Sequence, residues 1–164
     1  MKVINSFKAI YDKDSKVLIL GTIPSVKSRD IGFYYSNPKN RFWETLEKVY
    51  DVKIGSSIQE KITFLKEKHI ALFDVLKTCD ISKSKDSSIK NPVPNDLSPI
   101  LKETSIKAIF TTGKTAYKLY QKYIFPKTKI EAILLPSTSP ANSPKGIESK
   151  LKVAYSLIRT YTDD

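Results

Sequence analysis

The chain has 164 residues, of which 40% are hydrophobic and 27% are charged. This composition excludes a disordered or fibrous chain, and the length allows one domain with a complete core but not two comfortable ones. We therefore expect a single domain over residues 1–164. A formal net charge of +11 favours a polyanionic partner such as nucleic acid. A lysine-rich composition can also reflect a biased genome, so the charge alone leaves both interpretations open.

The single cysteine, Cys79, cannot form an internal disulfide, and its expected role is packing in a reducing compartment. No cluster of Cys and His has the spacing of metal ligands, so we expect no metal and no other cofactor. No apolar segment approaches the roughly 18 residues that span a bilayer, and the N-terminus carries no signal core. We expect a cytoplasmic monomer that does not bind membranes.

The first apolar run, residues 17–20, predicts a short buried strand. The stretch after it holds five aromatic and amide residues within eight positions, namely Phe33, Tyr34, Tyr35, Asn37 and Asn40. Large aromatic side chains on a loop lose entropy unless they pack or bind something, so this stretch predicts a ligand-binding loop with at least one aromatic in the core. Flat rings beside amides suit a flat, hydrogen-bonding ligand such as a nucleobase.

Helical spacing of apolar residues runs from residue 40 to residue 50 and places Trp43 in the core. A second helix is expected to start near Ser56 or Ser57, and residues 70–75 predict another buried strand. Residues 77–94 are rich in Ser, Lys, Asp and Pro, a composition that predicts a long polar loop.

The rest of the chain alternates between helix and strand. Ser98 is the expected N-cap of a helix through residue 103, with Pro99 in its first turn. The later elements are a strand at 106–110, a helix opened by Gly113, a strand at 130–135 and a helix at 147–161. Four apolar strands alternating with helices predict a three-layer α/β/α sandwich with a central four-stranded, mainly parallel sheet.

Ligands of parallel sheets bind at the carboxyl ends of the strands. The loops after residues 20, 75, 110 and 135 are therefore expected to meet on one rim. Asp74 ends the second strand at this rim, where it can orient a water or a sugar, although an Asp there can equally cap a loop. Thr112 and Gly113 can approach a base or a phosphate, or simply form a tight turn.

Four motifs resemble those of the uracil-DNA glycosylase superfamily, in the same order and over nearly the whole chain. They are Gly21-x-x-Pro24, the aromatic stretch 32–35, Pro38-x-Asn40-Arg-Phe-Trp43, and Leu135-Pro-Ser-Thr-Ser-Pro-Ala-Asn142. Within the superfamily, the chain is most similar to the DNA-deoxyinosine (hypoxanthine-DNA) glycosylase branch, and next to the mismatch-specific uracil/thymine glycosylases. The expected domain is then a single uracil-DNA-glycosylase-like domain.

The resemblance implies hydrolysis of the N-glycosidic bond of a deaminated base in DNA, in base excision repair and without a cofactor. Tyr35 falls where the related mismatch enzymes place the aromatic that stacks on the base. Many relatives carry Asp or Asn immediately before the motif proline, whereas this chain has Ile23. In deoxyinosine-type members the essential role is attributed to the asparagine that matches Asn40, which we assign to water positioning because an amide is not a strong base. Asn40 also fits a helix N-cap, and Asn37 ranks second for the catalytic role.

The remaining candidates bind the base or the DNA backbone. The expected base-binding residues are Thr22, Ile23, Tyr34, Tyr35, Asp74 and Thr112. Hydroxyls and an amide at a helix entrance are expected to bind phosphates, while the 140–141 segment wedges into the gap left by the flipped base. The expected DNA-binding residues are Ser25, Lys27, Lys83, Lys85, Ser137, Thr138, Ser139, Pro140, Ala141, Asn142 and Lys145, with Arg29 and Lys90 as further phosphate contacts.

Three functions remain open at this point. The favoured one is a monofunctional glycosylase acting on hypoxanthine, because the acidic water activator is absent at Ile23. The second is a mismatch-type enzyme of the same fold acting chiefly on uracil. The third is a nucleic-acid-binding module of this fold without catalysis. A lyase activity is not expected, since no lysine lies in a plainly apolar pocket.

Overall fold

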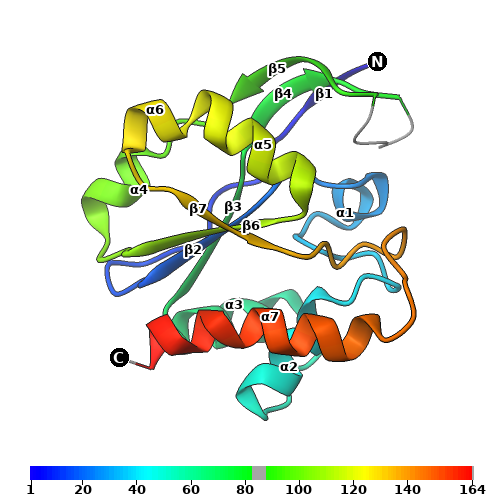
Figure 1. The fold of residues 1–164 in the computed structure, drawn as a ribbon, viewed down its shortest axis with the longest axis vertical. Coiled ribbons are helices and arrows are strands. Elements are labelled where there is room, and N and C mark those ends of the chain that lie inside the picture. The colour runs from blue at the N-terminus through cyan, green and yellow to red at the C-terminus, as the bar shows by residue number, and fades with distance from the viewer. Residues whose placement is uncertain (83–87, 164) are drawn as a thin grey trace.

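A parallel four-stranded sheet forms the centre of the molecule, in a computed structural model that describes residues 1–82 and 88–163 (Figure 1). Its strand order is β3-β2-β6-β7. These strands are β2 (Val17–Gly21), β3 (Ile70–Asp74), β6 (Ala108–Thr112) and β7 (Ala132–Leu135). Every residue of β2 is buried, as expected of a strand covered on both faces. The predicted parallel sheet is confirmed.

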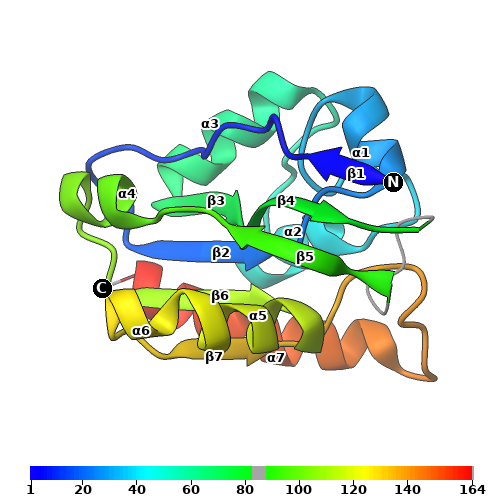
Figure 2. The same ribbon diagram turned by 90° about the horizontal axis from the view of Figure 1, so that it is seen from above.

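Helices cover both faces of this sheet (Figures 1 and 2). Val17 and Ile19 face a core formed with the first group of helices, and Leu18 and Leu20 face the second group. The first group is α2 (Phe42–Tyr50), α3 (Ile58–Glu67) and α7 (Ile147–Thr162), and the second is α4 (Ser98–Glu103), α5 (Lys114–Tyr123) and α6 (Phe125–Thr128). The three-layer α/β/α sandwich predicted from the sequence is therefore confirmed.

A second, antiparallel sheet lies beside the first, in the order β1-β4-β5. Its strands are β1 (Lys2–Ile4), β4 (Leu76–Asp80) and β5 (Lys90–Pro94). The prediction of a loop across residues 77–94 was therefore wrong for the ends of that stretch. The polar composition misled because β5 is an edge strand, where prolines and exposed polar residues are tolerated. Residues 83–87 lie outside the described part of the chain.

The aromatic stretch between β2 and α2 contains a short helix, α1 (Val26–Ile31), that the sequence analysis missed. Ser25 caps it by accepting the Ser28 N–H at 3.1 Å, and Gly32 ends it with φ 91°. A helix of six residues holds too few apolar positions to show a period. The interpretation of the whole stretch as a loop was therefore incomplete.

Most other boundaries differ from the prediction by one or two residues. Helix α2 begins at Phe42 rather than at residue 40, and α4 begins at Ser98 itself, with Leu97 before it. Trp43 and Cys79 are buried, as predicted. None of the helices in the described ranges is long and apolar enough to cross a membrane.

Candidate active site

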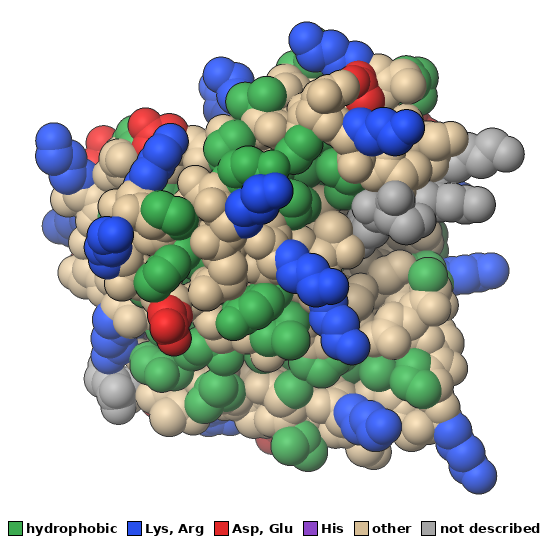
Figure 3. Space-filling view, turned by 45° about the horizontal axis from the view of Figure 1, so that its top comes forward, with side chains coloured by type: hydrophobic (Ala, Val, Ile, Leu, Met, Phe, Trp, Pro, Cys, Tyr) green, Lys and Arg blue, Asp and Glu red, His purple; other side chains and the backbone are tan. Residues whose placement is uncertain are grey.

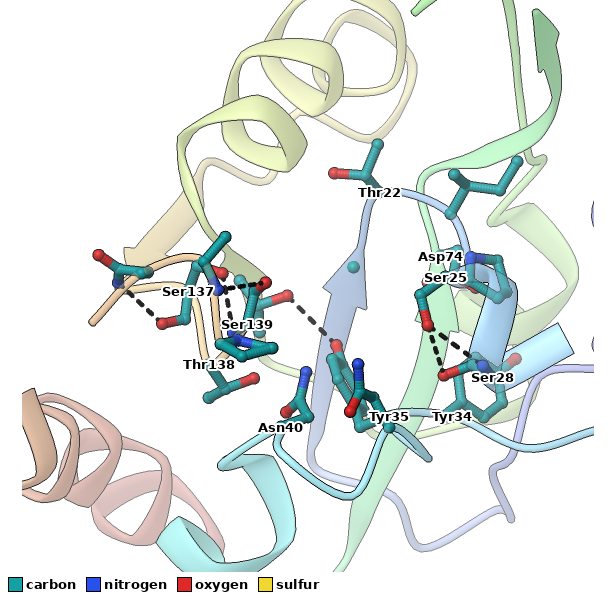
Figure 4. Close-up of a pocket in the computed structure, with 18 of the residues that line it drawn as sticks. Thr22, Ser25, Ser28, Tyr34, Tyr35, Asn40, Asp74, Ser137, Thr138 and Ser139 are labelled. Carbon is teal, nitrogen blue, oxygen red and sulfur yellow. Dashed lines mark hydrogen bonds between the residues drawn. The ribbon is translucent and has the colours of Figure 1, made fainter. Parts of the chain in front are cut away.

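A pocket of about 680 Å³ opens at the carboxyl ends of the parallel strands. The loops after β2 and β7 line it together with Asp74 and Thr112, the last residues of β3 and β6, so the carboxyl ends of the four strands meet on one rim (Figure 4). The pocket brings together most of the candidate residues, namely Thr22, Ile23, Ser25, Tyr34, Tyr35, Asn37, Asn40, Asp74, Thr112, Ser137, Thr138, Ser139, Pro140, Ala141 and Asn142.

Several basic candidates lie apart from this pocket. Lys27 on α1 and Lys145 before α7 are exposed and do not line it. Lys83 and Lys85 lie outside the described residues. Buried Ser28 lines the pocket and was missed; its hydroxyl accepts the Ser36 N–H at 3.1 Å, which ties α1 to the aromatic loop. Within residues 1–82 and 88–163, no three His, Cys, Asp or Glu side chains come together as metal ligands.

Three side-chain oxygens converge above Gly21 at the bottom of the pocket. A β-carbon at this position would lie 2.9 Å from Asp74 Oδ1, 3.1 Å from the Tyr35 hydroxyl and 3.7 Å from Thr112 Oγ1. The first distance is too short for a side-chain carbon, and the second is tighter than most real contacts. The glycine at the end of β2 is therefore what allows a carboxyl and two hydroxyls to share this space.

Asp74 is a buried carboxyl at the end of β3, with 3% of its surface exposed. Asn5 Nδ2 donates a hydrogen bond to Asp74 Oδ2 at 3.1 Å. Burial raises the pKa of Asp74 to about 7, and the hydrogen bond from Asn5 opposes this rise. Near neutral pH the carboxyl is therefore divided between its protonated and ionised forms, so it can donate or accept a hydrogen bond.

Tyr35 is fixed at both ends of its side chain. Its ring stacks on Phe42 with centroids 3.8 Å apart and an interplanar angle of 10°, and its hydroxyl lies 3.2 Å from Thr112 Oγ1. The backbone of Tyr35 has φ 53°, a left-handed conformation that is unfavourable for an aromatic residue. One ring face is occupied by Phe42, and Tyr35 lines the pocket.

Phe33 and Tyr34, which precede Tyr35, belong mainly to the core. The sequence predicted that at least one aromatic residue of this stretch would be buried. Phe33 and Tyr34 are 5% and 3% exposed, and their rings meet edge to face. The Tyr34 hydroxyl donates to the Lys8 carbonyl at 2.8 Å, and Trp43 Nε1 donates to the Tyr34 carbonyl at 3.1 Å. Tyr34 therefore contributes a wall of the pocket, with its hydroxyl already engaged.

The two candidate asparagines have similar hydrogen bonding. Asn40 Oδ1 accepts the Phe42 N–H at 2.9 Å, and Asn37 Oδ1 accepts the Lys39 N–H at 2.9 Å. Each side-chain oxygen thus supports the backbone, while neither NH₂ group has a hydrogen-bond partner among the described residues. Asn40 does stabilise the start of α2, but from one residue before the N-cap position, which Arg41 occupies. Its capping bond leaves the NH₂ group available to the pocket.

The loop of residues 137–142 forms the wall opposite Asp74 (Figure 4). Ser137 Oγ accepts the Ser139 N–H at 3.1 Å, and Asn142 Nδ2 donates to the Ser137 carbonyl at 2.9 Å. The prediction that this loop lies at a helix entrance was wrong, because α7 begins only at Ile147, after Gly146. Pro144 intervenes, and the loop is instead held to α2 by the Arg41 N–H, which donates to the Thr138 carbonyl at 3.0 Å.

Comparison with known proteins gives consistent results. The chain is 34% identical over 145 residues to a hypoxanthine DNA glycosylase from Methanosarcina acetivorans, covering 83% of this chain and 86% of that protein. It is 31% identical over 141 residues to the protein of the same name from Methanosarcina barkeri, with the same coverage.

A solution NMR structure from Methanosarcina acetivorans, described as a candidate uracil DNA glycosylase, is also similar to this fold. It superposes with a TM-score of 0.80 at 29% identity and covers 96% of this chain and 99% of that one. A model of the uracil DNA glycosylase superfamily matches residues 8–156. The chain therefore belongs to the uracil DNA glycosylase superfamily.

Proposed function

We propose that this protein is a monofunctional DNA glycosylase of base excision repair that releases deaminated bases from DNA, with hypoxanthine favoured. The observation that carries the proposal is that Tyr35, Asn40 and Asp74 line the same pocket. The names of the two Methanosarcina relatives support hypoxanthine as the base. The pocket volume of about 680 Å³ leaves room for a purine nucleoside.

Each of these three residues has a role in the proposed reaction. The base rotates out of the duplex and stacks on Tyr35, and Asp74 and Thr112 read its edge. Cleavage of the bond between the base and C1′ gives a sugar with oxocarbenium character and an anionic base. Asn40 positions the water whose oxygen bonds to C1′ as the bond to the base breaks, and a proton from this water ends on the released base. The protonated form of Asp74, which burial maintains up to about pH 7, avoids a second negative charge beside the departing base.

The pocket rim is proposed to hold the DNA strand. Ser137, Ser139 and Asn142 contact phosphates, with Ser25 on the opposite wall, whereas Thr138, with 2% of its surface exposed, is too buried to reach one. The segment from Pro140 to Ala141 fills the gap left by the flipped base. Lys27 and Lys145, which are exposed outside the pocket, contact phosphates further along the strand.

The proposed enzyme does not cleave the strand itself. A lyase step needs an amine in the pocket, and no lysine of the described chain lines it. Heat or alkali is then required to break the strand after the base is released. We also propose that the protein acts as a cytoplasmic monomer.

The test is base release from end-labelled duplexes that hold one hypoxanthine, uracil or xanthine, followed by alkaline cleavage. Wild type is compared with Asn40→Ala. Release of hypoxanthine that is lost in the variant, with DNA binding retained, is the expected result. Release of uracil alone would move the protein to the mismatch type. Binding without release from any duplex would leave a nucleic-acid-binding module.

A further inference from the structure

Asn5 is a fully hydrogen-bonded side chain that lies just after β1, outside the segment matched by the superfamily model. Its Nδ2 group donates to Asp74 Oδ2 and to the Leu76 carbonyl, both at 3.1 Å. Its Oδ1 accepts the Phe7 N–H at 3.0 Å. Because the oxygen is fixed by a backbone donor, the amide has only one orientation, and that orientation points its NH₂ group at Asp74.

The hydrogen bond from Asn5 determines which oxygen of Asp74 faces the pocket. Oδ2 is held by Asn5, whereas no described residue donates a hydrogen bond to Oδ1. Oδ1 is the oxygen that lies beside Gly21, in the space shared with the Tyr35 hydroxyl. A carboxyl held through one oxygen cannot rotate freely, so its second oxygen stays directed at the pocket.

We propose that Asn5 is a positioning residue for base release: it holds Asp74 through Oδ2 so that Oδ1 meets the edge of the flipped base. This inference rests on the proposed glycosylase function and adds a residue to it from outside the matched segment. Asn5 acts through Asp74 and does not itself line the pocket.

The surroundings of Asp74 give this contact a measurable signature. The titratable groups that interact with it are Tyr34 and Tyr35, from the loop before α2, and burial holds the pKa of both tyrosines above its usual value. From the other elements, Asn5 after β1 bonds the carboxyl, and Thr112 on β6 shares the space above Gly21 with it; both groups are uncharged. Burial raises the pKa of Asp74 and the bond from Asn5 lowers it, so loss of that bond raises the pKa further.

The test compares Asn5→Ala and Asn5→Ser with wild type. It measures the single-turnover rate of hypoxanthine release from a duplex saturated with enzyme, over a range of pH values. Ser keeps an oxygen for the turn at Phe7, which protects the fold, but is too short to hold Asp74. We expect the rate to fall about tenfold or more in both variants. DNA affinity should stay within about twofold of wild type, and the pH midpoint assigned to Asp74 should move upward.

A matched control uses a second amide–carboxylate pair, which joins β4 to β5 in the antiparallel sheet. Asn91 Nδ2 donates to Asp80 Oδ2 at 2.8 Å, away from the pocket. Asn91 has φ 52°, so Asn91→Gly removes this bond without straining the backbone. The rate and pH profile of this variant should match those of wild type.

A double-mutant cycle separates positioning from a general structural role. If Asn5 acts through Asp74, Asn5→Ser adds nothing to the loss already caused by Asp74→Ala. An equal loss in both backgrounds, or a wild-type rate and pH profile in Asn5→Ser, overturns the inference. Failure of wild type to release any base overturns the proposed function instead, so the two failures are distinct.

Discussion

Asp74 is almost completely buried, and only one of its two carboxyl oxygens is hydrogen-bonded by a described residue. Ionisation of this carboxyl therefore lowers the folding stability. Its folded pKa is raised from 3.8 to about 7 by burial. The stability contributed by its protonated form is fully present below pH 3.8 and is lost as pH rises through about 7. Asp74→Asn, which cannot ionise, should therefore match wild type near pH 4 and exceed it by about 2–4 kcal/mol at pH 8.

Urea unfolding at pH 4, 6 and 8 measures this difference, with exposed Asp14→Asn as the control. Base release by Asp74→Asn should fall even as stability rises, because an amide whose oxygen is held by Asn5 can only donate to the base edge, whereas the carboxyl can donate or accept. A stability difference that is the same at every pH would show that Asp74 is not protonated in the folded protein.

Asn40 has a structural role on its oxygen and a proposed catalytic role on its NH₂ group, and substitution can separate them. Its oxygen stabilises the start of α2 through the Phe42 N–H, and its NH₂ group is available to the pocket. Asn40→Asp keeps the oxygen and loses the NH₂ group, whereas Asn40→Ala loses both. We expect Asn40→Ala to lose about 1 kcal/mol of stability and Asn40→Asp to lose little.

Base release should fall about a hundredfold or more in both Asn40 variants if the NH₂ group holds the water. Thermal unfolding and single-turnover release on the same samples give both quantities. Full activity in Asn40→Asp would mean that an oxygen acceptor is sufficient at this position and that the NH₂ group has no part in the reaction.

Among the elements, α7 supports the pocket through one buried hydroxyl. Tyr155 on α7 donates to the Pro136 carbonyl at 2.7 Å, just before the 137–142 loop. Tyr155→Phe leaves that carbonyl without its donor, at a cost of about 1–3 kcal/mol. Because the loop loses this connection to α7, we also expect weaker DNA binding and slower base release.

Tyr50→Phe provides the matched comparison. The Tyr50 hydroxyl bonds Thr162 at the other end of α7, far along the helix from the 137–142 loop. Unfolding and base-release measurements should show a similar stability loss in both variants but slower release only in Tyr155→Phe. Equal activity in the two would mean that the loop does not depend on α7.

An element could be predicted from the sequence when its burial leaves a clear apolar pattern along the chain. The four parallel strands were identifiable because both faces are covered, which makes each an apolar run. β4 and β5 were missed because they form a small sheet with exposed positions and prolines, and α1 because it is a helix of only six residues.

The site was predictable in its residues but not in its internal contacts. Local motifs placed Tyr35, Asn40 and Asp74 at the same rim, because the carboxyl ends of parallel strands coincide. The bond between Asn5 and Asp74 joins the segment after β1 to the end of β3, 69 positions apart, and no local pattern encodes it. The raised pKa of Asp74 depends on burial by the whole fold, so it too was inaccessible from the sequence.

At the scale of the whole molecule, the excess of positive charge has two interpretations that binding measurements can separate. The chain has 28 Lys and Arg residues against 17 Asp and Glu. Basic side chains are spread over the face that carries α5 and β5, with few acidic ones among them (Figure 3). If the charge serves DNA binding, a subset near the pocket should displace counterions from phosphates. If it reflects composition alone, no position should matter more than another.

Fluorescence anisotropy with a hypoxanthine duplex from 50 to 300 mM salt measures this dependence. We expect log affinity to fall with log salt with a slope of about −4 to −6. Lys27→Ala and Lys145→Ala should each reduce that slope by about one. Lys66→Ala is the control, because this exposed residue lies in the last turn of α3, near the start of β3 and therefore at the amino end of the strands, opposite the pocket. If all three variants change the slope equally, the charge acts as a diffuse field and the rim lysines have no special contact with the strand.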